Sequence, residues 1–194
     1  MKNILKVIPL HTNEAKTIKY ALEGKREAQK TLYNRYAPKM LSVCRYYIKD
    51  LHFAEDVMVT AFFKAFTNLE SFRGDGSFEG WLRRIMVRES ISFLRSKKEM
   101  DYLEDGFASL TSDEMDENLE DVDIETLQLL IDELPEGYKT VLILYAVEGH
   151  SHKEIAEMLS IAESTSKSQL FKARRLLQQQ LLALKNKEHG RAKI

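Results

Sequence analysis

Cysteine, proline and glycine are scarce in this sequence, whose 194 residues include 1 Cys, 3 Pro and 8 Gly. This composition excludes disulfide-rich and collagen-like classes. The single cysteine, Cys44, follows a largely apolar run, so we expect a buried, reduced thiol. No apolar run reaches the roughly 18 residues of a membrane helix, and the start of the chain lacks a signal-peptide core. The sequence therefore predicts a cytoplasmic protein without direct membrane insertion.

Motifs for catalysis and for metal or phosphate binding are also missing from the sequence. It has no Gly-rich phosphate loop, no Cys-x-x-Cys and no His-Glu-x-x-His. His150 and His152 stand two residues apart, and this spacing puts them on different faces of a helix. Glu55 and Asp56 are adjacent acids in a first helical turn, where the helix dipole favours acids. We therefore predict a protein that is not an enzyme and takes no cofactor, metal or small-molecule substrate.

The formal net charge of −1 conceals a strong segregation of charge along the chain. Residues 14–98 carry 17 bases against 10 acids, and residues 127–194 carry 10 bases against 8 acids. Between them, residues 99–126 carry 12 acids and no base. Such a density of like charge repels itself and resists packing. The pattern predicts two mildly basic domains joined by a flexible acidic linker.

Both basic blocks have apolar residues at three- and four-residue spacing, which is typical of amphipathic helices, and neither shows the sustained alternation of a strand. We therefore predict an all-α fold with two small helical domains. The predicted helices span 14–23, 25–49, 51–70 and 78–97 in the first domain, and 124–133, 136–147, 152–159 and 163–185 in the second. The predicted divisions are an N-terminal extension at 1–13, a four-helix domain at 14–98, the acidic linker at 99–123, a helix-turn-helix domain at 124–185 and a basic tail at 186–194.

The predicted helix 51–70 carries apolar residues on two sides. Its broad apolar stripe, which includes Ala54 and Phe62, is the expected core face. At about 100° per residue, the opposite side also contains large apolar residues. That side carries Asp56, Val59, Thr60 and Phe63. Either another helix of the same domain covers these residues, or they form a docking patch for another protein.

The helix predicted after Phe78 carries a basic stripe of Arg84, Arg88 and Arg95 on one side. The loop before it, residues 70–81, combines glycines, aromatic residues and small polar residues. These components suit an unstacked base, because a ring can contact the face of the base and polar groups its edge. An ordinary interhelical loop beside a solvated helix face is the alternative.

A helix-turn-helix pattern lies near the C-terminus. Ser151 and Glu154 form a capping box, and a short turn leads to a second helix that begins near Glu163. From residue 164 to 180 this second helix has four bases and no acid. The predicted DNA-contacting residues are Ser164, Thr165, Lys167, Ser168, Gln169, Phe171, Lys172 and Arg175. A helical hairpin that does not bind DNA is one alternative, and Phe171 packed as core against Ile161 is another.

The order of these segments resembles the sigma-70 family, specifically the extracytoplasmic-function (ECF) group, which keeps only the region 2 and region 4 domains. The resemblance covers nearly the whole chain, from about residue 15 to 185. The segments that resemble region 2 are 54–57, 61–66, 72–74, 81–85 and 93–95. The segments that resemble region 4 are 134–135, 154–156 and 165–168.

The resemblance implies a sigma factor that binds core RNA polymerase and directs promoter recognition and DNA opening. In that family the first domain binds the polymerase clamp and melts the −10 element, the second contacts the β-subunit flap and reads the −35 element, and the acidic connector enters the polymerase cleft. The implied partners are core RNA polymerase and promoter DNA, and an anti-sigma factor is left open. The polymerase-binding residues are expected to be Asp56, Val59, Thr60, Phe63 and Lys64. The −10 and melting residues are expected to be Phe72, Arg73, Ser77, Trp81, Arg84, Arg88 and Arg95.

This sequence departs from the family at several positions. Val59 and Thr60 stand where the family often has Gln and Glu, which predicts more apolar clamp contacts. Ser166 takes a usually apolar, buried place, so we expect looser packing there or a bond from its hydroxyl to the backbone. The alternative function is a stand-alone helix-turn-helix regulator with an N-terminal sensing or dimerisation domain, which would bind duplex DNA without polymerase.

Overall fold

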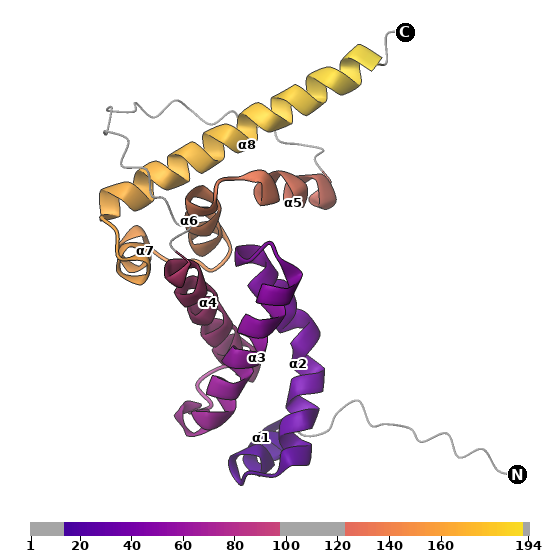
Figure 1. Cartoon of the computed structure of the whole chain (residues 1–194), viewed down its shortest axis with the longest axis vertical. Helices are drawn as coiled ribbons and strands as arrows, with labels where there is room; N and C mark the ends of the chain where they lie inside the picture. The colour runs from indigo at the N-terminus through magenta and orange to yellow at the C-terminus, as the bar shows by residue number, and fades with distance from the viewer. Residues whose placement is uncertain (1–13, 98–122, 192–194) are drawn as a thin grey trace, which may run out of the picture. The chain divides into compact units, whose positions relative to one another are not determined.

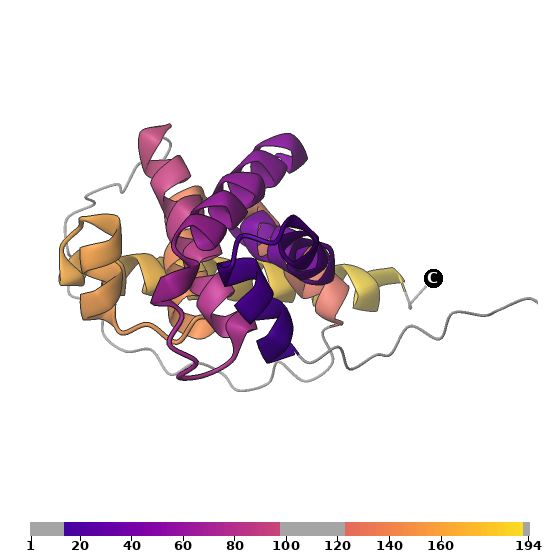
Figure 2. The same ribbon diagram turned by 90° about the horizontal axis from the view of Figure 1, so that it is seen from below.

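A computed structural model of the chain describes residues 14–97 and 123–191, and within these ranges it contains helices and no strand (Figures 1 and 2). The all-α prediction is therefore confirmed. By its internal contacts the chain divides into two compact units, Met1–Ser90 and Ile91–Ile194. This division falls inside a helix, whereas the sequence predicted the end of the first domain at residue 98.

Three helices begin the first unit, and each packs against the next along the chain. They are α1 (Glu14–Leu22), α2 (Arg26–Tyr47) and α3 (Leu51–Thr67). Gly24 ends the first of them with a φ of +76°, and its N–H donates to the Ala21 carbonyl. A residue with a side chain rarely adopts this left-handed conformation, so glycine at this position permits the tight connection to α2.

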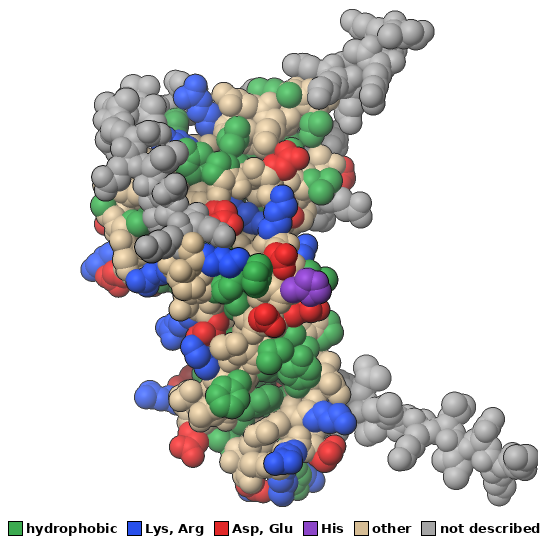
Figure 3. All heavy atoms as spheres, in the orientation of Figure 1, with side chains coloured by type: hydrophobic (Ala, Val, Ile, Leu, Met, Phe, Trp, Pro, Cys, Tyr) green, Lys and Arg blue, Asp and Glu red, His purple; other side chains and the backbone are tan. Residues whose placement is uncertain are grey.

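The core of the first unit is completed by the part of α4 (Phe78–Ser96) up to Ser90, and α4 follows a short 3-10 helix, η1 (Leu69–Ser71). Leu32 and Met40 of α2 and Leu82 and Met86 of α4 are fully buried. Cys44 is also buried, as the sequence predicted, and its Sγ lies 3.9 Å from Met86 Sδ. Burial raises the pKa of the Cys44 thiol to about 11, so the thiol is protonated at neutral pH. Hydrophobic side chains also remain on the surface of this unit (Figure 3).

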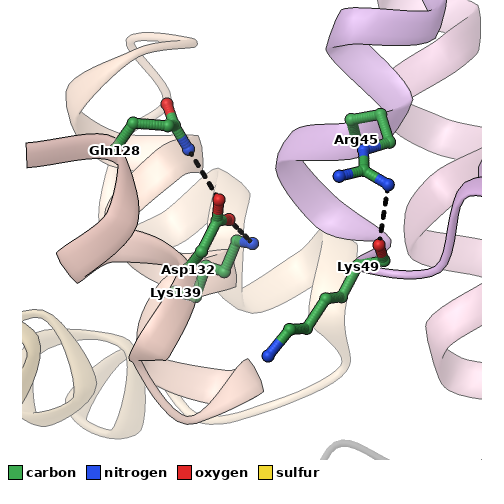
Figure 4. A network of polar contacts seen from close by, with 5 residues as sticks. All are labelled: Arg45, Lys49, Gln128, Asp132 and Lys139. Atoms are coloured by element: carbon green, nitrogen blue, oxygen red, sulfur yellow. Dashed lines mark hydrogen bonds and ion pairs between the residues drawn. The ribbon is translucent and has the colours of Figure 1, made fainter. Parts of the chain in front are cut away.

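The second unit contains the helices α5 (Ile124–Glu133), α6 (Glu136–Ala146), α7 (His152–Leu159) and α8 (Glu163–Arg191). Both α6 and α7 pack against α8, and a polar cluster joins α5 to α6 (Figure 4). In this cluster Lys139 Nζ lies 2.5 Å from Asp132 Oδ1, and the Gln128 amide lies 3.4 Å from Asp132 Oδ2. Lys139 is only 5% exposed, so Asp132 supplies the counter-charge that a buried ammonium requires.

Most helix bounds agree with the sequence prediction within two residues, and the exceptions have local causes. The predicted helix 51–70 ends at Thr67, because the Asn68 side chain donates to the Lys64 carbonyl and the chain tightens into η1. The last helix continues to Arg191, past the predicted end at 185, so part of the predicted tail is helical. The extension 1–13 and nearly all of the linker 99–123 lie outside the described residues.

Candidate functional site

The exposed side of α3 is the first candidate site. The Asp50 side chain caps this helix by accepting from the Phe53 N–H at 3.1 Å, which fixes where the helix begins. On the outward side Val59 is 52% exposed and Phe63 is 71% exposed. The core side buries Ala54, Val57, Met58, Ala61, Phe62 and Ala65. Because no helix of the described ranges covers Val59 or Phe63, the contact with another helix of the same domain is not formed.

Polar residues and one further aromatic residue complete this face. Asp56 and Thr60 are exposed beside Val59 and Phe63, as the sequence predicted. Phe53 is 40% exposed and stands three and seven residues before Asp56 and Thr60, a spacing that places it on the same side of the helix. Sequence reasoning missed Phe53, although this spacing was visible. We call these five residues, Phe53, Asp56, Val59, Thr60 and Phe63, the α3 patch.

Lys64 borders the α3 patch, but it already has a partner within the fold. Its Nζ lies 2.6 Å from Glu89 Oε2, which comes from α4. Half of the Lys64 side chain remains exposed, so this ion pair is partly solvated and contributes little to stability. Its geometric effect is to hold the end of α3 against α4.

Three aromatic rings lie together where the loop after η1 meets the first turn of α4. The ring centroids of Phe72 and Trp81 lie 5.5 Å apart, and each lies within 5.5 Å of the Phe78 ring. Phe78 is buried and also contacts Tyr36 of α2, while Phe72 and Trp81 keep part of their surface exposed. The two outer rings are therefore held by the core and still accessible from solvent, as a platform for stacking requires.

Polar groups of this loop take separate roles. The Ser77 hydroxyl accepts from the Gly80 N–H at 3.0 Å, so this side chain caps the start of α4. Arg73 is exposed, and Gly74 and Gly76 have φ values of +80° and +131°. These two glycines permit the sharp turn that brings Ser77 to the helix start. Of the two predicted polar contacts, Arg73 is open to a ligand, and Ser77 is engaged in capping.

The arginines of α4 that the sequence singled out are all exposed. Arg84 and Arg88 are four residues apart, and Arg95 follows seven residues after Arg88, so the three follow one side of the helix. Leu82, Met86 and other apolar residues of the same helix are buried. The predicted basic stripe is thus solvent-facing and available to an anionic partner such as a phosphate backbone.

The second unit contains the helix-turn-helix that the sequence predicted. Both hydrogen bonds of the capping box between Ser151 and Glu154 are present. After α7, Ser160 adopts a left-handed conformation with a φ of +56°, and α8 begins three residues later. A left-handed residue at the end of a helix is usually glycine and sometimes asparagine, and here this position is taken by serine. The turn therefore joins two well-defined helix ends.

The outer side of α8 carries most of the predicted DNA-contacting residues. Ser164, Lys167 and Arg175 are exposed, and Lys167 Nζ lies 2.7 Å from Glu163 Oε1 of the preceding turn. The Ser168 hydroxyl donates to the Thr165 carbonyl at 3.0 Å. The half-buried members of the set are Thr165, Ser168, Phe171 and Lys172. Glu163 lowers the local positive charge beside Lys167, a partner that sequence reasoning did not consider.

Gln169 is a correction to the predicted set. Its side chain is 1% exposed, so it cannot reach a base edge or a phosphate. At about 100° per residue, Gln169 lies about 60° from Ser166, close enough to the centre of the inner side to be covered. The prediction treated Gln169 as solvent-facing because it is polar, but its position on the helix places it among the buried residues.

Ser166 is a second correction, because its hydroxyl lies against a side chain of α7 rather than bonding to its own backbone. It is 0% exposed, and its Oγ lies 3.0 Å from Nδ1 of His152 at the start of α7. The His152 ring stacks on Tyr145 of α6 with centroids 4.7 Å apart and an interplanar angle of 23°. Sequence reasoning set His152 aside after excluding a metal pair with His150, and no sequence signal linked it to Ser166.

The protonation of His152 is sensitive to these surroundings. Partial burial of the ring, together with the nearby charges of Lys167 and Arg174, lowers the pKa of His152 below its ordinary value of 6.5, and Glu163 opposes this effect. A lowered pKa in the folded state means that neutral His152 contributes stability above pH 6.5, and that this contribution is lost as the pH falls through the folded pKa.

We therefore expect the melting temperature of the wild-type chain to decrease as the pH is lowered from about 7.5 to about 5. This decrease should be steeper than that of His152→Phe. The variant keeps a ring at this position and has no proton to bind. Calorimetric melts of both proteins at several pH values measure the two slopes, and His150→Phe provides a matched control. Identical slopes for wild type and His152→Phe would contradict the lowered pKa.

Two family models match the chain, and they match in the order that the sequence predicted, with region 2 before region 4. The model for sigma-70 region 2 matches residues 32–99, and the model for sigma-70 region 4 matches residues 124–177. The ECF RNA polymerase sigma factor SigW of Bacillus subtilis is 32% identical over 178 residues, which cover 86% of this chain and 95% of that protein. The chain belongs to the ECF group of the sigma-70 family.

Other relatives of the same group align over similar lengths. The ECF RNA polymerase sigma-E factor of Haemophilus influenzae is 29% identical, over 84% of this chain and 92% of that protein. A solved structure of the sigma factor RpoE with the anti-sigma factor NepR from Bartonella quintana aligns with a TM-score of 0.48 and 22% identity, over 78% of this chain and 95% of that chain.

Membership of the ECF group settles the broad function. This sigma factor directs RNA polymerase to promoters for transcription initiation, and the two matches together cover residues 32–99 and 124–177. A stand-alone helix-turn-helix regulator is not favoured, because residues 32–99 match region 2 rather than an unrelated sensing domain. Within the part of the chain that the structure describes, no helix is long and apolar enough to cross a bilayer.

Proposed function

We propose that this sigma factor binds core RNA polymerase chiefly through the α3 patch. The observation that carries this proposal is the exposure of Phe63 and Val59, 71% and 52%, on a helix whose other side is packed in the core. Exposed large apolar residues beside polar ones are typical of protein interfaces, where an aromatic residue often supplies most of the binding energy. Lys64 lies at the edge of this surface and is restrained by Glu89.

The loop 72–81 and the arginine stripe of α4 together suit promoter opening. Phe72 and Trp81 offer partly exposed rings for an unstacked base of the −10 element, and Arg73 is exposed and able to contact its sugar-phosphate backbone. The exposed stripe of Arg84, Arg88 and Arg95 then holds the adjacent strand. Ser77 contributes by capping α4, and its O–H remains able to donate to a base edge.

The outer side of α8 is the proposed reader of the −35 element. It presents Lys167, Lys172 and Arg175 to phosphates or to guanine, and the hydroxyls of Ser164, Thr165 and Ser168 to phosphates. Phe171 is half-buried, so part of its side chain is accessible to a thymine methyl group. Gln169 is removed from this set because its side chain is buried.

We propose that the protein catalyses no reaction itself, takes no cofactor or metal, and acts in the cytoplasm beside the polymerase. The acidic linker, nearly all of which lies outside the described residues, would occupy a basic polymerase channel and oppose nonproductive DNA binding. Residues 99–126 carry 12 acids and no base, and this density of negative charge repels nucleic acid.

Substitutions on α8 test the upstream contact. Lys167→Ala and Arg175→Ala are expected to weaken holoenzyme binding to all promoter duplexes alike. Each should also reduce the slope of log affinity against log salt by about one, because one phosphate is no longer neutralised. Phe171→Ala is expected to cost on the order of 1–3 kcal/mol at a single base pair and to relax selectivity there.

The measurement is a titration of holoenzyme, formed from the full chain and core polymerase, on duplexes selected from genomic fragments by run-off transcription. Lys153→Ala, an exposed base of α7 outside the outer side of α8, is the matched control. If Phe171→Ala lowers the melting temperature and leaves relative promoter preferences intact, the ring is a core residue and its proposed base contact is wrong.

A further inference from the structure

Three helices of the second unit meet at the side chain of His152. Tyr145 of α6 stacks on one face of its ring, with centroids 4.7 Å apart. Ser166 of α8 places its hydroxyl 3.0 Å from Nδ1. The Arg174 guanidinium, also from α8, lies 5.6 Å from the centroid of the Tyr145 ring. The His152 side chain of α7 thus contacts both neighbouring helices, and Arg174 adds a direct contact between α8 and α6.

The contact to Ser166 is specific in a way that apolar packing is not. A serine within a helix usually bonds to its own backbone, and an apolar residue at the same place could slide against α7. Here the hydroxyl is fully buried and one polar atom of α7 lies within hydrogen-bond distance. Without that partner a buried polar group would be unsatisfied, so the hydrogen bond favours one orientation of α8 relative to α7.

Orientation matters because Lys167 follows Ser166 directly and begins the outer side of α8. A rotation of the helix by about 10° moves an atom about 5 Å from its axis by roughly 1 Å. A shift of that size exceeds the tolerance of about 0.5 Å within which a recognition site must be held. A small rotation of α8 would therefore weaken base contacts while leaving nonspecific phosphate attraction largely intact.

We propose that His152 is a positioning residue for promoter recognition, whose contacts with Ser166 and Tyr145 fix the rotation of α8 and thereby the sequence selectivity of its outer side. This inference rests on the proposed reading of the −35 element by α8. His152 itself is half-buried beside Tyr145 and Ser166 and is not assigned a DNA contact. Its role acts through Ser166 and the helix to which Ser166 belongs.

Several charged groups surround this cluster and enter the design of the test. Lys167, Arg174 and Glu163 of α8 act on the His152 ring electrostatically, and Tyr145 of α6 covers one face of the ring. Binding is therefore measured at about pH 7.5, where His152 is neutral because its pKa is lowered, so the variants do not differ in the charge at this position.

Two substitutions separate the contacts of the ring. His152→Phe keeps an aromatic ring for Tyr145 and removes the hydrogen bond to Ser166. His152→Asn removes the ring and places an amide nitrogen near the position of Nδ1, so it can restore the hydrogen bond. Ser166→Ala removes the other partner, and the double variant His152→Phe with Ser166→Ala completes a double-mutant cycle. His150→Phe is the matched control two residues away.

The measurement is the ratio of holoenzyme affinities for a selected promoter duplex and for the same duplex with a scrambled upstream element. Helical content and melting temperature are recorded for the full chain of every variant. We expect His152→Phe and Ser166→Ala each to lower this ratio about 3- to 10-fold, the size of one net hydrogen bond. The double variant should show no larger decrease than either single variant, and His152→Asn should recover most of the ratio.

Two outcomes would overturn the inference about His152 alone, and a third would overturn it together with the proposed function of α8. The first is an unchanged ratio in His152→Phe while Lys167→Ala still weakens binding, which rejects the role of His152 and leaves the proposed reading by α8 intact. The second is an equal decrease of the ratio in His152→Phe and His152→Asn that parallels their decrease in helical content, which makes His152 a stabilising residue only. If Lys167→Ala, Arg175→Ala and His152→Phe all leave binding unchanged, the proposed function of α8 fails together with this inference.

Discussion

The variant Phe63→Glu is expected to lose co-purification with core RNA polymerase while it keeps the helical content of the wild type. Phe63 is 71% exposed, so replacing it changes few contacts within the fold, and exposed substitutions of this kind usually alter stability by about 0.5 kcal/mol or less. In the bound state the same position would bury an unpaired carboxylate, at a cost of several kcal/mol. A penalty of about 3–4 kcal/mol weakens binding by roughly 100- to 1,000-fold.

A matched control for this variant exists on the same helix. Leu51 is 45% exposed and lies outside the α3 patch, so Leu51→Glu introduces the same charge on α3 at a comparable exposed apolar residue. Phe53→Glu, at the start of the patch, should weaken binding by an intermediate factor, because Phe53 is less exposed than Phe63. Pull-down with purified core polymerase and circular dichroism measure the two properties. A folded Phe63→Glu protein that is still captured as well as Leu51→Glu would reject the α3 patch as the polymerase-binding surface.

Four of the five residues of the α3 patch, all but Phe53, were predicted from sequence, because their position depends on helical periodicity alone. The core stripe of α3 is continuous, so the apolar residues outside it stand out against the expected polar side. The start of the helix was also predictable from a local signal, because Asp50 is a residue type that caps helices and its side chain accepts from an N–H of the first turn. Local rules of this kind also predict the helix bounds of both units, with errors where a side chain such as Asn68 changes the end of a helix.

Other features of the site depend on contacts between helices and could not be read from spacing. Gln169 is buried although its type is polar, because its position near the inner side of α8 brings it under other helices. The bond between His152 and Ser166 joins residues 14 positions apart, and its geometry depends on how α7 crosses α8. The pairing of Lys64 with Glu89 likewise depends on the packing of α3 against α4. Each of these changes the interpretation of a predicted site residue.

The aromatic loop contains both features that the sequence predicts and features that depend on contacts within the fold. Its composition predicted a platform for an unstacked base, and the structure places Phe72 and Trp81 with centroids 5.5 Å apart and partly exposed. The sequence did not show that Ser77 caps α4 or that Phe78 anchors the rings in the core. These contacts decide which substitutions are informative. Ser77→Ala would remove a helix cap at a cost of about 1 kcal/mol, and Phe78→Ala would open a cavity in the core.

Trp81→Ala and Arg73→Ala are therefore the preferred variants of this loop, and Trp81→Ala is expected to have the larger effect on promoter opening. Stacking of a base on an aromatic ring contributes about 1–3 kcal/mol, so removing the ring should reduce transcription from a duplex promoter roughly 5- to 150-fold. On a template with a pre-melted bubble at the −10 element, the unpairing has already occurred, and transcription should stay within about twofold of wild type.

Comparing the two templates distinguishes opening from the other roles that Trp81 could have. A defect in polymerase binding or folding lowers transcription on both templates equally, whereas a defect in capturing an unstacked base lowers it on the duplex alone. Tyr20→Ala, which removes a half-buried aromatic residue of α1 away from the loop, is the control for a general decrease in stability. Equal defects of Trp81→Ala on duplex and bubble templates would reject a role in opening and assign the ring to folding, through its contacts with Phe72 and Phe78, or to polymerase binding.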